Sequence, residues 1–272
     1  MKSEKHLEDL CAAVQQGEPL IVAGVGSGLT AKGAVAGGVD AIAVYNTAVY
    51  RNRGLPTALA FLPYDSANAL TLKVAPEIIA VAAEVPVLIG LGAHDPRVPI
   101  DALLNNVAAL GAAGVTNEPF VGIYGDDLRS QLEAAGLGFE REVMLIRRAV
   151  ERGMLALGWA FTPEEAGAMA EAGAQMVGAM IGVTAGGPAG GAALTPLEDA
   201  MNRISAMCRA ALVAREDVIV LGHGGPLNDP GSVGELLRRT GAHGYVTGST
   251  GERMPVEHGV AEAMRRFKSL RF

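Results

Sequence analysis

The stretch Asp217–Pro255 carries two glycine-rich segments whose residue types suit the binding of an anion. Gly222–Gly225 and Gly248–Gly251 each follow a short apolar run, and His223 and Ser249 lie within them. Glycine lets the backbone approach a ligand closely, and successive backbone N–H groups form a concave anion site. Glycine-rich exits from the last two strands of a (β/α)8 barrel usually hold a phosphate group. The sequence therefore predicts an anion site made by Gly222, Gly224, Gly225, Gly248 and Ser249.

Polar residues also follow the other apolar runs, at the points where buried strands would end. Catalytic groups in (β/α)8 barrels lie at the carboxyl ends of the strands, so these residues are expected to share one face. Two histidines, several carboxylates and both glycine segments on one face predict an active or binding site there. The residues at these ends are Gly24, Gly26, Ser27, Tyr45, Asn46, His94, Asp95, Asn117, Glu118, Trp159, Thr184, His223, Ser249 and Glu252.

Many of these residues also have an ordinary structural interpretation. Asp95 precedes a proline and could cap a turn, Asn117 could brace the end of its strand, and Tyr45 with Asn46 could form a turn. His223 could be a buried histidine with satisfied partners, and Glu252 could form a surface ion pair with Arg253. The same reasoning favours an ordinary loop role for His94 and a packing role for Trp159.

The elements that would position this face are eight apolar runs separated by helical segments. The runs are continuous rather than alternating, as strands buried on both faces require. A glycine precedes most of them and could form a left-handed helix C-cap; these are Gly38, Gly114, Gly153, Gly173 and Gly241. The sequence predicts one α/β domain over residues 1–272, a (β/α)8 TIM barrel whose N-terminal helix, Lys5–Gln16, closes the bottom. The predicted strands are Leu20–Ala23, Ala41–Tyr45, Val87–Leu91, Val115–Thr116, Leu155–Gly158, Gln175–Ile181, Val218–Leu221 and Tyr245–Thr247.

Two loops and two helix starts stand out between these runs. We expect the longest loop over residues 120–138, and long loops in compact domains are usually lids or binding loops. The glycine-rich segment 182–191 could be a simple flexible connection or a moving lid. Thr162–Glu165 and Thr195–Glu198 each place Thr three residues before Glu, with proline between, which predicts a helix-capping box at each position.

Bulk composition excludes several classes of function. The formal net charge is −7, and no run of lysine or arginine is present, so nucleic acid is not an expected partner. The two cysteines have no metal-like spacing, and the first turn is charged, which together favour a reduced cytoplasmic protein without a signal peptide. No apolar run is long enough to cross a membrane. Only 4% of residues are aromatic, and alanine-rich helix surfaces make a homo-oligomer plausible.

Several sequence blocks resemble a known family. The blocks are GVGSGLTAKGAVAGGVDAIAVYNTAVYR, LPYDSANAL, HDP, NEPFVG, LRSQLEAAGLGFEREV, LGHGGP and GSTGERMPVE, and they extend over nearly the whole chain. Together they resemble the phosphoenolpyruvate hydrolase-like family, also called TIM-barrel signal-transduction proteins. That family is similar to the isocitrate lyase and phosphonopyruvate-processing barrels. The resemblance implies a hydrolase or lyase that acts on a phosphoenolpyruvate- or phosphonopyruvate-like small anionic acid.

The resemblance also implies roles for individual residues. Asp95, with Glu118, is the candidate ligand pair for a Mg²⁺ ion that would neutralise a developing enolate. His223, near the ordinary pKa of histidine, would transfer a proton, and Glu252 is a further catalytic candidate. The expected substrate-binding residues are Tyr45, Asn46 and Asn117, which would orient a carboxylate, together with Gly24, Gly26, Ser27 and the two glycine segments.

Two other functions remain open at this point. A non-catalytic barrel could bind a metabolite and signal through an oligomer. An aldolase that forms a Schiff base is the weaker alternative, because no lysine stands at a predicted strand end; the lysines considered are Lys2, Lys5, Lys32, Lys73 and Lys268.

Overall fold

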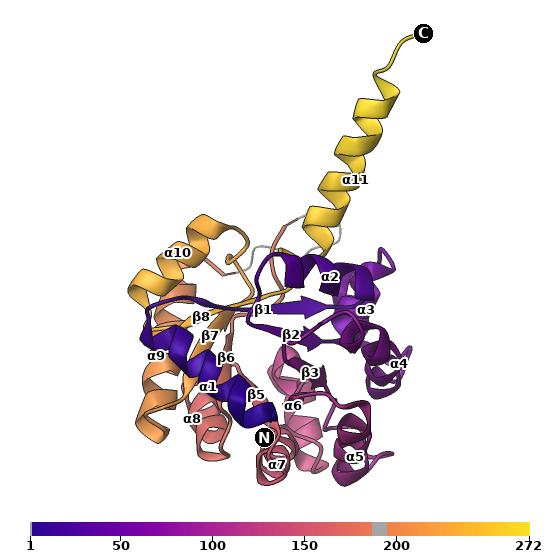
Figure 1. Ribbon diagram of the computed structural model, residues 1–272. Coiled ribbons are helices and arrows are strands. Elements are labelled where there is room, and N and C mark those ends of the chain that lie inside the picture. The colour runs from indigo at the N-terminus through magenta and orange to yellow at the C-terminus, as the bar shows by residue number, and fades with distance from the viewer. Residues whose placement is uncertain (1, 187–194) are drawn as a thin grey trace.

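Eight parallel strands close into a barrel in the order β1 to β8 in a computed structural model that describes residues 2–186 and 195–272 (Figure 1). Each strand pairs with its sequence neighbour, and β1 pairs with β8 through Leu20 opposite Gly244. The (β/α)8 prediction is therefore confirmed. The strands are β1 Leu20–Val25, β2 Ala41–Val44, β3 Val87–Gly90, β4 Gly114–Thr116, β5 Leu155–Ala160, β6 Met176–Met180, β7 Ile219–His223 and β8 Gly244–Thr247.

Helices surround the barrel and bury its outer surface. The helices are α1 Lys2–Gln15, α2 Gly28–Ala36, α3 Asn46–Asn52, α4 Ala67–Ile79, α5 Ile100–Leu110, α6 Asp126–Ala134, α7 Phe139–Glu151, α8 Pro163–Glu171, α9 Leu197–Ala214, α10 Pro230–Arg239 and α11 Arg253–Lys268. Two short 3-10 helices are η1 Thr57–Phe61 and η2 Val121–Ile123. None of the described helices is both long and apolar enough to span a membrane.

The barrel interior is filled by apolar side chains that point inward from the strands. Leu20, Leu88 and Leu157 are fully buried there, and Trp159 packs among them with 1% of its surface exposed. Leu10 of α1 belongs to the same cluster, and Ser3 Oγ donates to the carbonyl of Ala113, which precedes β4. The N-terminal helix thus closes the amino ends of the strands, as predicted, and leaves the carboxyl ends free for a site.

Three local predictions were wrong. Residues 120–138 are not a single loop, because they contain η2 and α6. The box predicted at Thr195–Glu198 does not form: α9 begins at Leu197 after Pro196, without a side-chain cap. Gly114 is not a C-cap but a strand residue, since an added Cβ would lie 2.0 Å from the Leu155 carbonyl oxygen.

Other caps form as their sequences require. Thr162 Oγ1 accepts a hydrogen bond from the Glu165 amide at 3.2 Å, and Glu165 Oε2 accepts one from the amide of Phe161 rather than of Thr162. The remaining four predicted cap glycines have positive φ angles between 72° and 95°, which glycine adopts without strain. Residues 187–194, most of the glycine-rich loop considered above, lie outside the described part of the chain.

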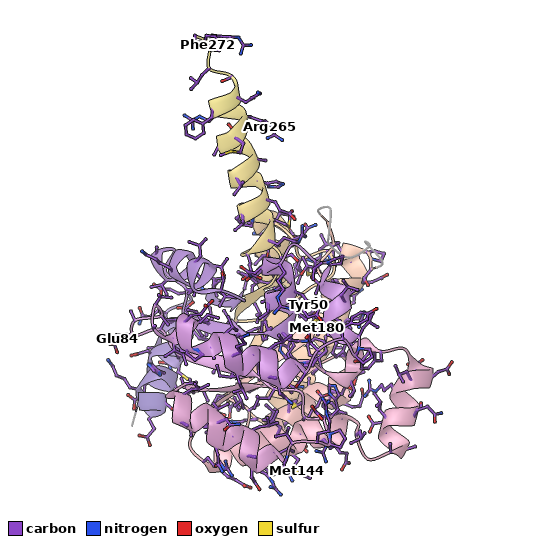
Figure 2. All side chains as sticks on the ribbon, turned by 90° about the vertical axis from the view of Figure 1, so that its right-hand side faces the viewer. Tyr50, Glu84, Met144, Met180, Arg265 and Phe272 are labelled. Atoms are coloured by element: carbon purple, nitrogen blue, oxygen red, sulfur yellow. The ribbon has the colours of Figure 1, made fainter. Side chains whose placement is uncertain are left out.

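α11 differs from the other helices because it projects away from the barrel instead of packing on it. Figure 1 shows it as a yellow rod that rises from the end of β8. Arg265 and Phe272 lie far from the barrel in the rotated view (Figure 2).

Candidate functional site

A small pocket lies at the carboxyl ends of the strands, and we call it the rim pocket. It is lined by Tyr45 after β2, Glu118 after β4, Met180 of β6, His223 of β7 and Gly248 after β8. Its cavity volume is about 30 Å³, roughly that of two water molecules, so a larger ligand can enter only if lining side chains move. The other lining residues are Thr47, Arg51, Thr57, Phe61, Phe120, Ile123, Gly182, Val183, Thr184 and Ser249.

Arg51 is the cation of the rim pocket. It reaches the pocket because α3 begins directly after β2, and Thr47 and Arg51, four residues apart, share one face of that helix. The guanidinium is 5% exposed, and its Nε donates to Glu252 Oε2 at 2.9 Å. Its Nη2 is buried and has no hydrogen-bond partner within residues 2–186 and 195–272. Part of the guanidinium is therefore held in place while another part is left to bind a ligand.

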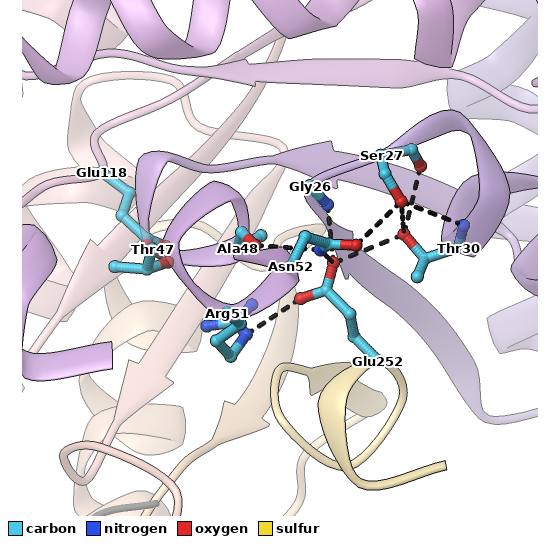
Figure 3. A network of polar contacts seen from close by, with 9 residues as sticks. All are labelled: Gly26, Ser27, Thr30, Thr47, Ala48, Arg51, Asn52, Glu118 and Glu252. Atoms are coloured by element: carbon cyan, nitrogen blue, oxygen red, sulfur yellow. Dashed lines mark hydrogen bonds and ion pairs between the residues drawn. The ribbon is translucent and has the colours of Figure 1, made fainter. Parts of the chain in front are cut away.

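Glu252 holds Arg51 through a polar network at the N-terminus of α11 (Figure 3). Its carboxylate also accepts from the backbone amide of Gly26 at 2.7 Å and from the side-chain amide of Asn52. Ser27 caps α2 and donates to Asn52 Oδ1 at 2.8 Å. These contacts place Glu252 behind Arg51, and Glu252 and Gly26 do not line the pocket. Glu252 is thus buried, and the interpretation as a surface ion pair with Arg253 was wrong.

Glu118 is a buried carboxylic acid at the floor of the rim pocket. Its Oε1 accepts a hydrogen bond from Thr47 Oγ1 at 2.5 Å. Burial raises the pKa of Glu118 to about 7, although the Thr47 hydrogen bond and the charge of Arg51 lower it in part. Near neutral pH this side chain can therefore either give or take a proton.

His223 is neutral over the physiological range. Its Nδ1 lies 2.7 Å from the Val246 carbonyl oxygen, and because a carbonyl can only accept, Nδ1 carries the proton and Nε2 is the acceptor. Burial, with a smaller contribution from the charge of Arg51, lowers the pKa of His223 to about 4, although the hydrogen bond to Val246 opposes the shift. The expectation of an ordinary histidine pKa was therefore wrong. His223 packs edge-on against Trp159, with ring centroids 5.2 Å apart, which fixes its ring.

Three residues that line the rim pocket each have a buried polar side-chain atom without a partner among the described residues. These atoms are Arg51 Nη2, Tyr45 Oη and Thr57 Oγ1. Burial also holds the pKa of the Tyr45 phenol well above its usual value, so this group remains an O–H donor. A buried donor without a partner costs about 1–3 kcal/mol, which a ligand with acceptor oxygens would recover. The arrangement therefore favours a carboxylate or a similar oxyanion.

Of the two predicted glycine-rich segments, 248–251 contributes residues to the rim pocket, whereas the glycines of 222–225 lie outside it. Gly248 and Ser249 line the rim pocket, and Ser249 is 2% exposed. Gly222 lies against Leu236 of α10, where an added Cβ would be 2.6 Å from a side-chain carbon. An added Cβ on Gly224 would lie 1.9 Å from the Gly182 carbonyl oxygen. Gly222, Gly224 and Gly225 do not line the pocket, so close packing alone accounts for the first two.

Other predicted site residues lie outside the rim pocket. Asp95 has both carboxylate oxygens bound by Arg97, which lowers the pKa of Asp95. Asn117 binds the backbone amide of Trp159 at 2.7 Å, and Asn46 donates to the Ala60 carbonyl at 2.8 Å.

Gly24 and Gly26, at the carboxyl end of β1, and His94, after β3, are also held by packing within the barrel. An added Cβ on Gly24 would lie 2.7 Å from the Thr247 carbonyl oxygen, and one on Gly26 would lie 2.3 Å from the Ala48 carbonyl oxygen. His94 is mostly buried, and that burial lowers its pKa. Close backbone packing explains both glycines without a ligand.

The residues that line the rim pocket do not form the donor set of a Mg²⁺ site. Within residues 2–186 and 195–272, no three His, Cys, Asp or Glu residues are grouped to hold a metal ion. Glu118 is the only carboxylate among the lining residues described, and it stands beside the cation Arg51. Mg²⁺ usually keeps several waters besides its carboxylate ligands, and a cavity of about 30 Å³ beside a guanidinium offers neither the room nor a favourable charge for them.

Sequence reasoning assigned no role to Arg51, Thr47 or Thr57. Arg51 and Thr47 could have been predicted as site residues, because they lie four residues apart, on one face of a helix, directly after a predicted strand end. Thr57 carried none, since it lies in η1, which no periodicity predicts.

Comparison with known proteins identifies relatives of the chain. The model of the family described as phosphoenolpyruvate hydrolase-like matches residues 5–270. The ToMV resistance protein Tm-1(GCR237) of Solanum lycopersicum is 38% identical over 265 residues, which are 97% of this chain and 35% of that protein. The chain thus spans about a third of the length of this curated relative.

Solved structures with a similar fold include two enzymes. A 2,3-dimethylmalate lyase of the PEP mutase/isocitrate lyase superfamily has a TM-score of 0.61 and 18% identity, with 97% of this chain and 87% of that chain covered. A phosphonopyruvate hydrolase, solved with oxalate and Mg²⁺, has a TM-score of 0.62 and 13% identity, with 97% and 86% covered. At these identities the likeness concerns the fold.

Proposed function

The chain belongs to the phosphoenolpyruvate hydrolase-like family, and we propose that it is a hydrolase or lyase that acts on a phosphoenolpyruvate- or phosphonopyruvate-like small acid in the rim pocket. Lyases and a phosphonopyruvate hydrolase are among the enzymes with this fold. The single observation that carries the proposal is the set of buried, unpartnered donors of Arg51, Tyr45 and Thr57 beside a carboxylic acid, Glu118.

The three donors would bind the substrate carboxylate. Arg51 Nη2 supplies positive charge and a hydrogen bond, and the hydroxyl groups of Tyr45 and Thr57 supply neutral donors. Gly248 and Ser249, which also line the pocket, would hold the phosphoryl or phosphonyl oxygens of the substrate. The chain's net charge of −7 makes this local cation necessary for an anion to enter.

The proposed chemistry is the formation and protonation of an enolate. In hydrolysis of phosphoenolpyruvate, water attacks phosphorus, the bond from phosphorus to the enol oxygen breaks, and the pyruvate enolate takes a proton at carbon. In a carbon–carbon lyase, a comparable enolate is the leaving group. Glu118, with a pKa of about 7, would deliver that proton and recover it from water. Neutral His223 would accept a hydrogen bond at Nε2 from the attacking water or a substrate hydroxyl.

Mg²⁺ does not enter this proposed mechanism, although the related phosphonopyruvate hydrolase was solved with it. The rim pocket offers one carboxylate among the described residues, and Asp95 is already bound by Arg97. We propose that Arg51 supplies the positive charge beside the enolate oxygen that a metal ion would otherwise supply.

The proposal is tested by incubating the chain with phosphoenolpyruvate, phosphonopyruvate and 2,3-dimethylmalate while phosphate, pyruvate and carbon–carbon cleavage products are measured. Arg51→Gln is expected to lower kcat/KM on the order of 100-fold, because one charge-stabilising donor is removed. Arg97→Gln is the matched control, since Arg97 is exposed and outside the pocket. Unchanged kcat/KM in Arg51→Gln, with the fold verified by circular dichroism, contradicts the assignment.

A second candidate function is a sensor that binds the same acids without turnover. It is favoured by the curated relative, which is named for virus resistance rather than for a reaction. A sensor would show a rise in melting temperature with these acids and no product. At a ligand concentration of 100 Kd the stabilisation is about 2.7 kcal/mol, and Arg51→Gln would abolish it.

A further inference from the structure

One part of the rim pocket holds polar atoms that the substrate carboxylate does not need. Thr184, in the loop after β6, lines the pocket and is 3% exposed. Its hydroxyl makes no hydrogen bond within residues 2–186 and 195–272, and Nε2 of His223 makes none there either. Nε2 can accept a hydrogen bond, because Nδ1 carries the ring proton and donates it to the Val246 carbonyl. An acceptor and a hydroxyl therefore remain available to a small molecule.

Gly248 leaves an open space beside these two atoms. A Cβ added to Gly248 would lie 3.7 Å from His223 Nε2 and 3.7 Å from Thr184 Oγ1. The nearest atom to that Cβ would be His223 Cε1, at 3.0 Å. The φ angle of Gly248 lies outside the left-handed region, so the backbone conformation does not require glycine at this position. The missing side chain therefore serves to keep the space open.

The loop that carries Thr184 is fixed against the end of β7. The Ile181 amide donates to the His223 carbonyl at 3.0 Å, and the Ala185 amide donates to the Gly225 carbonyl at 2.9 Å. These two hydrogen bonds hold the backbone on both sides of Thr184. The hydroxyl thus has a defined position beside the histidine ring, and a group that orients a reactant needs such a fixed position.

We propose that Thr184 is a further catalytic residue, and that Thr184 and His223 together hold the water molecule that attacks the substrate, in the space over Gly248. This inference rests on the proposed function and narrows it to hydrolysis, because a carbon–carbon lyase needs no nucleophilic water. The water donates one hydrogen bond to His223 Nε2 and shares another with Thr184 Oγ1, and its oxygen keeps a lone pair for phosphorus. An ordered water typically has about two to four such partners.

The protons and bonds of this step balance for phosphoenolpyruvate. The water oxygen bonds to phosphorus, and the bond from phosphorus to the enol oxygen breaks. One water proton stays on the released phosphate. The other passes through His223 Nε2 to solvent, because the ring, with its pKa lowered to about 4, does not keep it. Glu118 gives its proton to the enolate carbon and recovers one from solvent, so the products are pyruvate and phosphate.

The first test removes the Thr184 hydroxyl. In Thr184→Val, kcat for phosphate release from phosphoenolpyruvate or phosphonopyruvate is expected to fall on the order of 100-fold with little change in KM, since a misplaced reactant alone can cost that factor. Thr184→Ser keeps the hydroxyl and should retain most of the wild-type kcat. Thr195→Val is the control, because Thr195 does not line the rim pocket. A wild-type kcat in Thr184→Val overturns the proposal.

The second test fills the space over Gly248. Gly248→Ala places a methyl group where the water would lie, so kcat for phosphate release should again fall on the order of 100-fold. Oxalate, which offers carboxylates and no phosphoryl group, should still raise the melting temperature of this variant as it does that of the wild type. That result shows a folded pocket that binds an acid without its nucleophile. Phosphate release by Gly248→Ala at the wild-type rate contradicts the water site.

The wild type separates this inference from the proposed function. In water labelled with heavy oxygen, mass spectrometry is expected to find the label in the released phosphate. Cleavage of the carbon–carbon bond of 2,3-dimethylmalate, without phosphate release from either phosphorus-containing acid, would support the proposed function as a lyase and overturn the water site. Turnover of none of the three acids would refute both.

Discussion

Loss of the Arg51–Glu252 ion pair should destabilise the fold strongly, because both charges are buried. The two side chains are 5% and 2% exposed, and the pair distance is 2.9 Å. Removing one partner of a buried pair typically costs about 3–5 kcal/mol, since the other charge is left without compensation. In Glu252→Gln the Gly26 amide can keep an acceptor, so the loss is mainly that of the charge. At about 2–4 °C per kcal/mol for a chain of this size, the melting temperature should fall by roughly 6–20 °C.

A double-mutant cycle separates this pair from the rest of the network. Urea denaturation of the wild type, Glu252→Gln, Arg51→Gln and the double variant gives four unfolding free energies. We expect the double variant to lose less stability than the sum of the single variants, by about 2–4 kcal/mol, because neither buried charge remains. Additive losses within about 0.5 kcal/mol would refute the reasoning, because uncoupled residues behave in that way. Arg97→Gln, at an exposed pair, should cost less than about 1 kcal/mol.

Three further predictions concern titration and glycine packing. If Glu118 is the acid that protonates the enolate, kcat/KM should fall as pH rises through about 7, and Glu118→Gln should remove that limb from the profile; a limb that persists contradicts the role. In the folded state, burial raises the pKa of Glu118 to about 7 and that of Glu142 to about 8. Up to those pH values the folded state therefore binds more protons than the unfolded state. The free energy of unfolding should consequently fall as pH rises from 6.5 to 8. The pKa of His223 is lowered to about 4, so its titration makes the free energy of unfolding rise with pH, but only below about pH 6.5. Urea denaturation that shows stability rising from pH 6.5 to 8 would therefore exclude this account. Gly224→Ala should destabilise the chain by at least about 2 kcal/mol, because φ is +83° and an added Cβ meets the Gly182 carbonyl oxygen. Gly33→Ala, where an added Cβ in α2 meets no other atom, should stabilise the chain by about 0.5–1 kcal/mol. Equal melting temperatures for the two variants would contradict the packing argument.

The fold could be predicted from sequence because each strand is a short continuous apolar run, and such runs can be buried on both faces only in a parallel sheet covered by helices. Helix α6 escaped prediction because its apolar spacing is limited to Leu128 and Leu132, and none of its residues is buried. Gly114 was misread for a different reason. A glycine before a strand can serve a left-handed cap or a close approach of two backbones, and only the neighbouring Leu155 carbonyl decides between them.

The candidate site could be predicted less well than the face that holds it. The rule that barrel sites lie at the carboxyl ends of strands pointed to Tyr45, Glu118, His223 and Ser249, which all line the rim pocket. It could not separate residues that face the pocket from those that stand behind it, such as Glu252 and Asn117. Whether a side chain faces the pocket depends on contacts between elements far apart in the sequence. Gly26 and Glu252, for example, are hydrogen-bonded although more than 200 residues separate them, and no local sequence pattern indicates this contact.

The position of Glu252 explains how one pocket can hold both a cation and an exchangeable proton. If Arg51 paired directly with Glu118, their attraction would lower the pKa of Glu118 and keep it ionised, and no free guanidinium nitrogen would remain for a ligand. Glu252 prevents this pairing by binding Arg51 at Nε from behind. Glu118 instead takes a neutral partner, Thr47, and keeps a pKa of about 7. In the proposed mechanism the buried carboxylate at the start of α11 would therefore act indirectly, because it would direct Arg51 towards the ligand and leave Glu118 free to exchange a proton.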